Sequence, residues 1–167
     1  VDSNGNEEWN QTYGGSQGLS EEFASSTGYS IKQTSDNGYI LTGRASFCKD
    51  NNEIKPLELC AESEENIRIN AFVILKIDDL GQQIWITSYG GQGDGYEESL
   101  DGLSIIETYD GYVAAGRRLI QDQYSLILIK TDFNGQIEWE RVYPNKTAYS
   151  LDISDDGGFI ISGRLIE

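Results

Sequence analysis

Residues 72–85 read FVILKIDDLGQQIW, and residues 126–139 repeat the pattern as LILIKTDFNGQIEW. Each copy has an apolar run that ends in lysine, an aspartate two positions later, and a tryptophan seven positions after the aspartate. Short runs rich in β-branched apolar residues and bounded by turn residues are typical of strands buried on both faces. In the second copy Asn134-Gly135 predicts a type I′ turn, because both central residues of that turn need positive φ. The two stretches therefore predict β-hairpins with a tryptophan on the second strand.

The same spacing recurs at the beginning of the sequence, where Asp2 precedes Trp9 by seven positions. A second element alternates with the first, and it reads NGYILTGR at 37–44, DGYVAAGR at 110–117 and GGFIISGR at 157–164. Its glycine-containing turns predict a further hairpin, so that one repeat consists of four antiparallel strands. No segment has a helical period, and the predicted fold class is all-β.

Four-stranded antiparallel repeats are typical of β-propeller blades. We expect the last strand of a blade in 1–13, one blade at 29–89 with an insertion at 45–70, another blade at 99–143, and the first two strands of a third at 147–167. A propeller typically has about 4–8 blades, whereas these elements supply about 11 strands, so an incomplete ring is predicted. A fragment of a longer propeller is the preferred explanation. The alternative is that copies associate through their open sheet edges into a ring or a filament.

The motifs NGYILTGR, FVILKIDDLGQQIW and YGG resemble repeats of secreted bacterial and archaeal β-propeller proteins. More distantly, they resemble the tryptophan-containing blades of quinoprotein-type propellers. That resemblance implies that Trp9, Trp85 and Trp139 dock between adjacent blades. It covers nearly the whole sequence outside the insertion, and it implies no cofactor, because no residue corresponds to those that hold the quinone.

The composition is acidic, with 28 Asp and Glu against 12 Lys and Arg, a net charge of −16 and no histidine. A surface this negative repels phosphate backbones and anionic lipid, which argues against nucleic acid and membrane partners. No apolar stretch approaches the roughly 20 residues of a membrane span, so membrane insertion is not expected. Without histidine no Ser-His-Asp or Cys-His arrangement can form, and we expect no enzyme of that kind.

Cys48 and Cys60, the two cysteines, flank a polar segment. The simplest interpretation is a disulfide that closes this segment, which would place the protein in an oxidising compartment, secreted or in the cell envelope. The alternatives are two free thiols or half of a metal site, although zinc would need two further ligands.

The acidic loop at 93–101 is the candidate calcium site, because calcium prefers carboxylate and carbonyl oxygens on a flexible loop. Its candidate ligands are Asp94, Glu97, Glu98 and Asp101. The spacing matches no strict calcium motif, and a solvated connecting loop is the favoured alternative.

Basic residues also recur at equivalent positions, namely Arg44, Arg117 and Arg164 in one element and Lys76 and Lys130 in the other. They could form an anion-binding ring. Their repetition favours structural ion pairs, with the aspartates of nearby turns as partners of the arginines, because ligand sites usually break the symmetry of a repeat.

The sequence therefore predicts a noncatalytic extracellular or cell-surface propeller module with a structural, adhesive or binding role. The expected partners are a protein, or other copies through the open edges, with a glycan as a further candidate. One alternative is a self-assembling surface component closed by strand exchange between copies. Another is a polysaccharide-binding or polysaccharide-hydrolysing propeller, since a carboxylate pair for glycoside hydrolysis can come together from distant positions.

Overall fold

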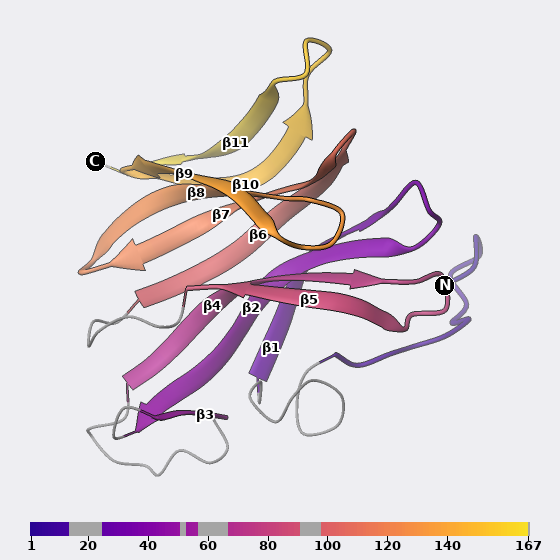
Figure 1. Cartoon of the computed structure of the whole chain (residues 1–167), viewed down its shortest axis with the longest axis horizontal. Helices are drawn as coiled ribbons and strands as arrows, with labels where there is room; N and C mark the ends of the chain where they lie inside the picture. The colour runs from indigo at the N-terminus through magenta and orange to yellow at the C-terminus, as the bar shows by residue number, and fades with distance from the viewer. Residues whose placement is uncertain (14–24, 51–52, 57–66, 91–97, 167) are drawn as a thin grey trace.

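The structure, a computed structural model, describes residues 1–13, 25–50, 53–56, 67–90 and 98–166 (Figure 1). These residues form eleven β-strands and no helix, so the all-β prediction is confirmed. Within the same ranges, no helical segment has the length and apolar character needed to cross a membrane.

The strands fall into two four-stranded units and a hairpin. The first unit comprises β1 (Ser25–Gln33), β2 (Tyr39–Asp50), β4 (Ile67–Ile77) and β5 (Gln83–Tyr89), paired in that order, and β3 (Glu53–Pro56) pairs with β2. The second unit comprises β6 (Glu98–Thr108), β7 (Gly111–Ile120), β8 (Gln123–Thr131) and β9 (Ile137–Pro144). The terminal hairpin comprises β10 (Lys146–Ile153) and β11 (Phe159–Leu165). All neighbours within a unit are antiparallel.

The two units and the hairpin lie side by side in chain order (Figure 1). A single parallel pair, Asn70 with Ser99, joins the first unit to the second through β4 and β6. The Asn70 side chain supports this junction, because its Nδ2 donates to Ser99 Oγ at 2.9 Å. At the next junction the backbone N–H of Leu151 donates to Ser104 Oγ at 3.1 Å.

The first two strands of each repeat share one register. In β1–β2, β6–β7 and β10–β11 the first strand has a bulge at which the pairing skips one residue. A glycine of the second strand lies opposite the first-strand residue at which this bulge begins. A β-carbon at Gly116 would overlap the carbonyl oxygen of Asp101 and approach the ring of Phe72. The equivalent carbonyl contacts are Gly43 with Thr27 and Gly163 with Thr147. The repeated glycine is therefore required by the close approach of the bulged first strand.

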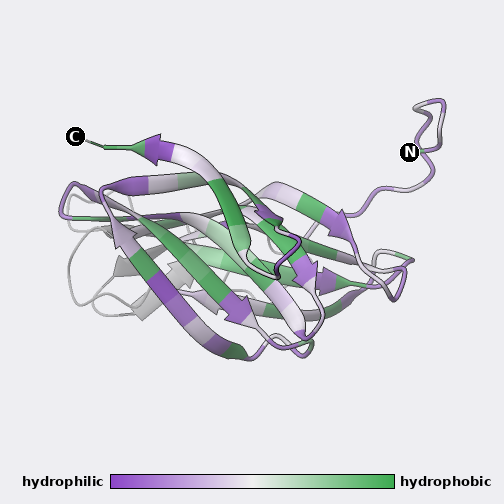
Figure 2. Cartoon of the chain, turned by 90° about the horizontal axis from the view of Figure 1, so that it is seen from above, coloured by the Kyte–Doolittle hydropathy of each residue, from purple (hydrophilic) through white to green (hydrophobic). Residues whose placement is uncertain are grey.

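The core lies between the units. One apolar cluster joins the first unit to the second, and its members are Ile40, Phe72, Ile74, Leu100, Ile105, Tyr112, Ala114, Ile127 and Ile129. A second cluster joins the second unit to the terminal hairpin, and its members are Ile106, Val113, Ala115, Leu126, Leu128, Ala148 and Leu151. Apolar residues occur mainly within the strands, whereas the turns are mostly hydrophilic (Figure 2). The second unit thus buries apolar residues against the first unit on one side and against the terminal hairpin on the other.

The turn prediction at Asn134-Gly135 was wrong. The N–H of Gly135 donates to the Asp132 carbonyl at 3.2 Å and the N–H of Asp132 donates to the Gln136 carbonyl at 2.9 Å. Only Gly135 has a positive φ, at 80°. The hairpin therefore has a three-residue loop with one left-handed glycine, which suits this strand twist as well as a type I′ turn does. The Asp132 carboxylate stabilises this loop, because its Oδ1 accepts hydrogen bonds from the N–H groups of Asn134 and Gln136.

Two expected boundaries also differ. Residues 1–13 contain no strand, and none of the described strands forms ladder hydrogen bonds with this segment. The predicted insertion at 45–70 is shorter, because the β2–β4 ladder continues to Lys49 opposite Ile67. The observed number of strands matches the expected one only because β3 takes the place of the strand expected in 1–13.

Candidate functional site

The recurring lysines bind the turn between the first two strands of their own unit. Lys76 on β4 is 3% exposed, and its Nζ lies 3.0 Å from Asp36 in the β1–β2 turn. The same Nζ donates to the Ile77 carbonyl at 3.1 Å. In the second unit Lys130 reaches Asp110 in the β6–β7 turn at 3.0 Å and also Glu138 at 2.9 Å. Both lysines therefore form structural ion pairs.

A threonine hydroxyl donates a hydrogen bond to each of these aspartates. Thr34 Oγ1 donates to Asp36, and this hydrogen bond, aided by Lys76, lowers the pKa of Asp36 to about 2. Lys130 lowers the pKa of Asp110, which also accepts from Thr108. The hydrogen bonds to Glu138 and Asp110 raise the pKa of Lys130 against the opposing effect of burial.

The Asp36–Lys76 pair makes stability depend on pH. Because the folded pKa of Asp36, about 2, lies below its ordinary 3.8, its contribution is complete above pH 3.8 and is lost as pH falls through 2. We expect Asp36→Asn to lower the unfolding free energy by about 1 kcal/mol at pH 6, a modest value because the carboxylate is more than half exposed. Urea titrations should show this difference shrinking between pH 4 and 2. Asp79→Asn, in the exposed β4–β5 turn, should match the wild type throughout, and a pH-independent difference would contradict the assignment.

Asp101 lies between the two recurring arginines. Its side chain is 3% exposed, and Oδ2 accepts from Arg117 Nε at 2.6 Å within the second unit. Oδ1 accepts no hydrogen bond but lies 3.5 Å from Arg44 Nη1 of the first unit. Hydrogen bonding to Asp101 raises the pKa of Arg117 against the opposing effect of burial. The ion-pair interpretation of Arg44 and Arg117 is confirmed, but the expected partners in the turns were wrong.

Removal of the Asp101 charge should weaken the junction between the units. Asp101→Asn keeps the size of the side chain but leaves two arginines close together without a counter-charge. We expect a loss of about 2 kcal/mol in unfolding free energy, less than for a fully buried pair because both arginines are about one-third exposed. Urea unfolding followed by tryptophan fluorescence measures it, with Asp155→Asn in an exposed turn as the control. Equal stability of the two variants would show that Asp101 carries no such role.

The candidate calcium ligands are only partly visible. Asp94 and Glu97 lie outside the described residues, and so does the side chain of Glu98. Asp101 is the one candidate with a described side chain, and its carboxylate is neutralised by arginines. Among the residues that the structure describes, no three Asp, Glu, Cys or His side chains are close enough to share a metal ion.

Cys60 and the side chain of Cys48 also lie outside the described part of the chain, so the disulfide remains a prediction.

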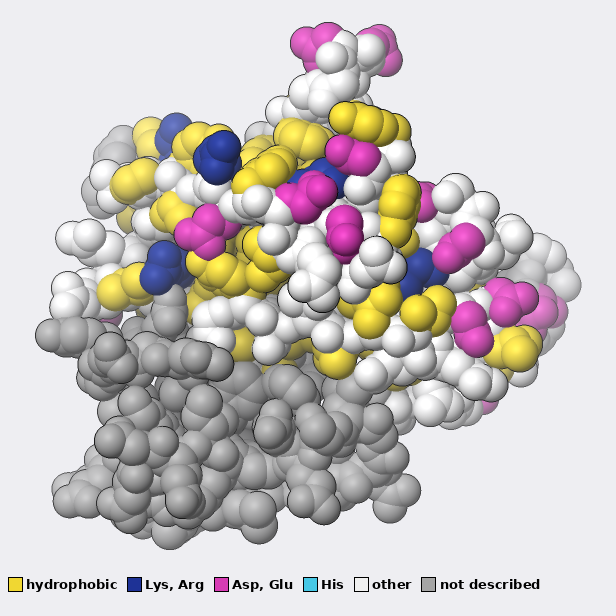
Figure 3. All heavy atoms as spheres, viewed as in Figure 1, with side chains coloured by type: hydrophobic (Ala, Val, Ile, Leu, Met, Phe, Trp, Pro, Cys, Tyr) yellow, Lys and Arg dark blue, Asp and Glu magenta, His cyan; other side chains and the backbone are white. Residues whose placement is uncertain are grey.

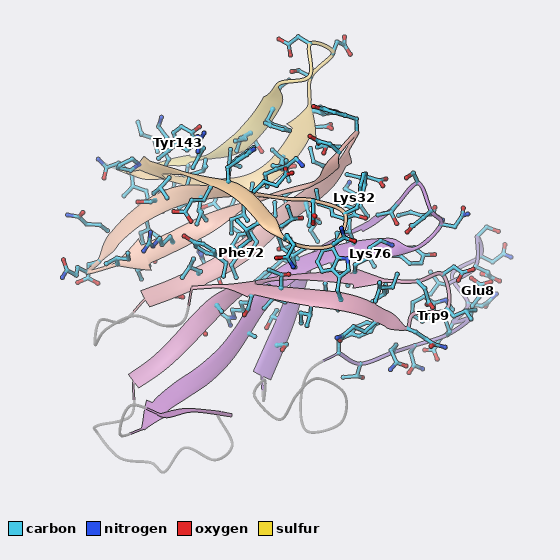
Figure 4. The ribbon with its side chains drawn as sticks, viewed as in Figure 1. Glu8, Trp9, Lys32, Phe72, Lys76 and Tyr143 are labelled. Carbon is cyan, nitrogen blue, oxygen red and sulfur yellow. The ribbon has the colours of Figure 1, made fainter. Side chains whose placement is uncertain are left out.

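Each recurring tryptophan contacts an aromatic residue near the start of the second strand of the next unit. The ring centroids of Trp85 and Tyr112 are 5.9 Å apart, and Trp85 Nε1 donates to the Phe133 carbonyl at 3.0 Å. The other two pairs are Trp9 with Tyr39 at 6.3 Å and Trp139 with Phe159 at 6.4 Å. Figure 4 shows Trp9 beside the first unit, while Phe72 and Lys76 lie nearer the middle of the molecule. The tryptophans thus occupy three equivalent positions between successive elements.

The outward face of the first unit carries an apolar hollow of about 100 Å³. Leu41, Val73, Leu75 and Ile86 line it, together with Tyr13. Tyr13 also donates to the Gly81 carbonyl at 2.6 Å, which anchors the N-terminal segment at this face. Arg44 and Tyr13 are the titratable residues among those that line the hollow.

The terminal hairpin differs from its two counterparts at one edge. β2 pairs with both β1 and β4, and β7 pairs with both β6 and β8, whereas β11 pairs with β10 alone among the described strands. Ile160 is 63% exposed, although Ile40 and Val113 at the equivalent register positions are fully buried. The β10–β11 turn projects from the body of the molecule with acidic side chains at its tip (Figures 1 and 3).

No protein-family model matches the chain, and no curated protein matches it either. The fold and the contacts described above define a repeat protein whose recurring charged and aromatic residues hold successive β-sheet units together.

Sequence reasoning missed the hydroxyl residues that support the lysine–aspartate pairs. They lie two positions before the aspartate, as Thr34, Thr108 and Ser154. An alignment of the three repeats on Asp36, Asp110 and Asp156 contains this signal. The role of Asp101 had no such signal, because threonines occupy its equivalent positions in the other repeats.

Proposed function

We propose that the chain is a row of β-propeller blades that acts as a noncatalytic structural or binding module of a secreted or cell-envelope protein. One observation carries the proposal: the same tryptophan–aromatic contact recurs at three successive junctions, at 6.3, 5.9 and 6.4 Å. Four-stranded antiparallel units packed face to face through such contacts are what blades of a propeller require. The first and second units and the terminal hairpin would then be two whole blades and half of a third.

The noncatalytic role rests on how the buried charges are used. Lys76, Asp101 and Lys130 are the buried charged residues of the described part, and each has an oppositely charged partner that belongs to the scaffold. Groups held in this way stabilise the blades and are not poised for proton transfer to a substrate. The extracellular location rests on the disulfide predicted between Cys48 and Cys60 and on the resemblance to secreted propeller repeats.

Two measurements test the location and the noncatalytic role. Intact cells of the source organism are treated with a membrane-impermeant biotin reagent, and the purified chain is incubated with a panel of polysaccharides. We expect the protein to be labelled on intact cells and no reducing sugar to be released. Labelling only after lysis would overturn the location, and sugar release above the protein-free blank would overturn the noncatalytic role. A crystal structure in which the units do not radiate from a common axis would overturn the blade assignment.

A further inference from the structure

The edge of β11 that no described strand pairs with has the features of a docking site for one more strand. In the other two repeats this edge is occupied, by β4 on β2 and by β8 on β7. The occupying strand places its lysine opposite one residue of the second strand, so that Lys76 faces Ile40 and Lys130 faces Val113. The equivalent residue of β11 is Ile160.

The β10–β11 turn, next to this edge, contains the aspartate that binds a lysine in the other two repeats. Asp156 occupies the position of Asp36 and Asp110, and Ser154 donates to its carboxylate as the threonines do in the other turns. The N–H of Gly158 donates to Asp156 Oδ1 at 3.0 Å, as the N–H of Gly38 donates to Asp36. Nothing positively charged reaches Asp156 among the described residues. The carboxylate is therefore oriented by its own turn but lacks the cation that its counterparts bind.

A glycine gives a second and independent indication. A β-carbon at Gly38 would collide with the Ile77 carbonyl and Lys76 Nζ, and one at Gly111 would collide with the Thr131 carbonyl and Lys130 Nζ. At Gly158 the same β-carbon would meet only the side chains of Asp156 and Ser154, at 3.1 Å each, and the φ of Gly158 is one that any residue adopts. The space that the incoming carbonyl and ammonium fill in the other repeats is therefore open at Gly158.

We propose that the β11 edge binds an antiparallel β-strand that carries an apolar run ending in a lysine, with the lysine opposite Ile160 and paired with Asp156. Main-chain hydrogen bonds to the edge would supply affinity, and the lysine would fix the register. This inference gives the partner chemistry of the binding module proposed above and rests on it. A second copy of the chain is a poorer source, because β4 and β8, the described strands with this chemistry, are already paired on both edges.

The probe is a fluorescent peptide with the sequence of residues 123–132, QYSLILIKTD, extended by a Gly-Ser tail for solubility. Fluorescence anisotropy should show saturable binding to the wild-type chain. Gly158→Ala should weaken binding at least tenfold, because its β-carbon occupies the place of the incoming carbonyl. The melting temperature should change little, because only the side-chain ends of Asp156 and Ser154 have to shift. Equal binding by the two proteins would overturn the proposal, since it would identify nonspecific adhesion of an apolar peptide, and absence of binding to the wild type would overturn it as well.

The lysine contact has its own control. A peptide with the change Lys130→Met should bind the wild type about tenfold more weakly than the parent peptide. The Asp156→Asn protein should bind the two peptides equally, which a general effect of peptide charge on an acidic protein would not produce. A retained tenfold preference in Asp156→Asn would overturn the pairing. A negative result here leaves cell labelling and the polysaccharide assay unaffected, so failure of the strand site is distinguishable from failure of the proposed function.

Discussion

Replacement of Gly116 by alanine is expected to lower the unfolding free energy by roughly 3 kcal/mol, because a β-carbon would be forced into the backbone of the neighbouring strand. The atoms in the way are the carbonyl oxygen of Asp101 and the ring of Phe72, which is itself fully buried. For a chain of this size the loss corresponds to a fall of about 6–12 °C in melting temperature. Thermal unfolding followed by far-UV circular dichroism measures it.

Gly28 is the matched control for this change. It lies on β1 in the first unit, a β-carbon there would meet nothing within 4 Å, and its φ is ordinary. Gly28→Ala should therefore change stability by less than about 0.5 kcal/mol. If both alanine variants melted together, the requirement for glycine at the bulge would be refuted.

Phe72→Ala is the second change with a large expected effect. Phe72 on β4 is fully buried, and it belongs to the apolar cluster that joins the two four-stranded units. Its ring lies against Gly102 and Gly116 of the second unit, so that backbone without side chains forms the opposite wall. Such a wall cannot collapse into the space left by the ring, and we expect a loss of about 3–5 kcal/mol in unfolding free energy.

Chemical denaturation with urea, followed by tryptophan fluorescence, measures the loss. Phe72→Leu, which keeps much of the volume, should cost less than half as much. Tyr109→Ala removes an aromatic ring that is 93% exposed and should have almost no effect. A Phe72→Ala protein as stable as Tyr109→Ala would mean that the two units do not share a core.

The repeats made the strand order predictable from the sequence. The lysine, the turn aspartate and the tryptophan recur at fixed spacing, and each has one structural role that recurs with it. The turn types were harder to predict, because Asn134-Gly135 also fits a three-residue loop in which the aspartate side chain accepts two N–H groups. Sequence preference alone does not distinguish these loops when both place the glycine at positive φ.

Contacts between units were the least predictable. The partner of Arg44 is Asp101, which lies 57 positions away on the first strand of another unit, and no local pattern links the two residues. The same holds for Ser35, whose hydroxyl and N–H both donate to Glu107 at 2.8 and 2.7 Å. These pairs depend on how one unit is rotated against the next, which the spacing within a unit does not determine.

The identical register of the three first-strand hairpins has an evolutionary consequence. Each four-stranded unit carries an aromatic residue near the start of its second strand and a tryptophan on its last strand. Duplication of the coding segment for one unit would therefore create a new junction at which both aromatic partners are present. The inserted copy would keep this aromatic contact at both of its junctions, although a charged pair such as Arg44 with Asp101 occurs at one junction only. Homologous genes should therefore differ in length by whole units, and a change of a single strand should be rare.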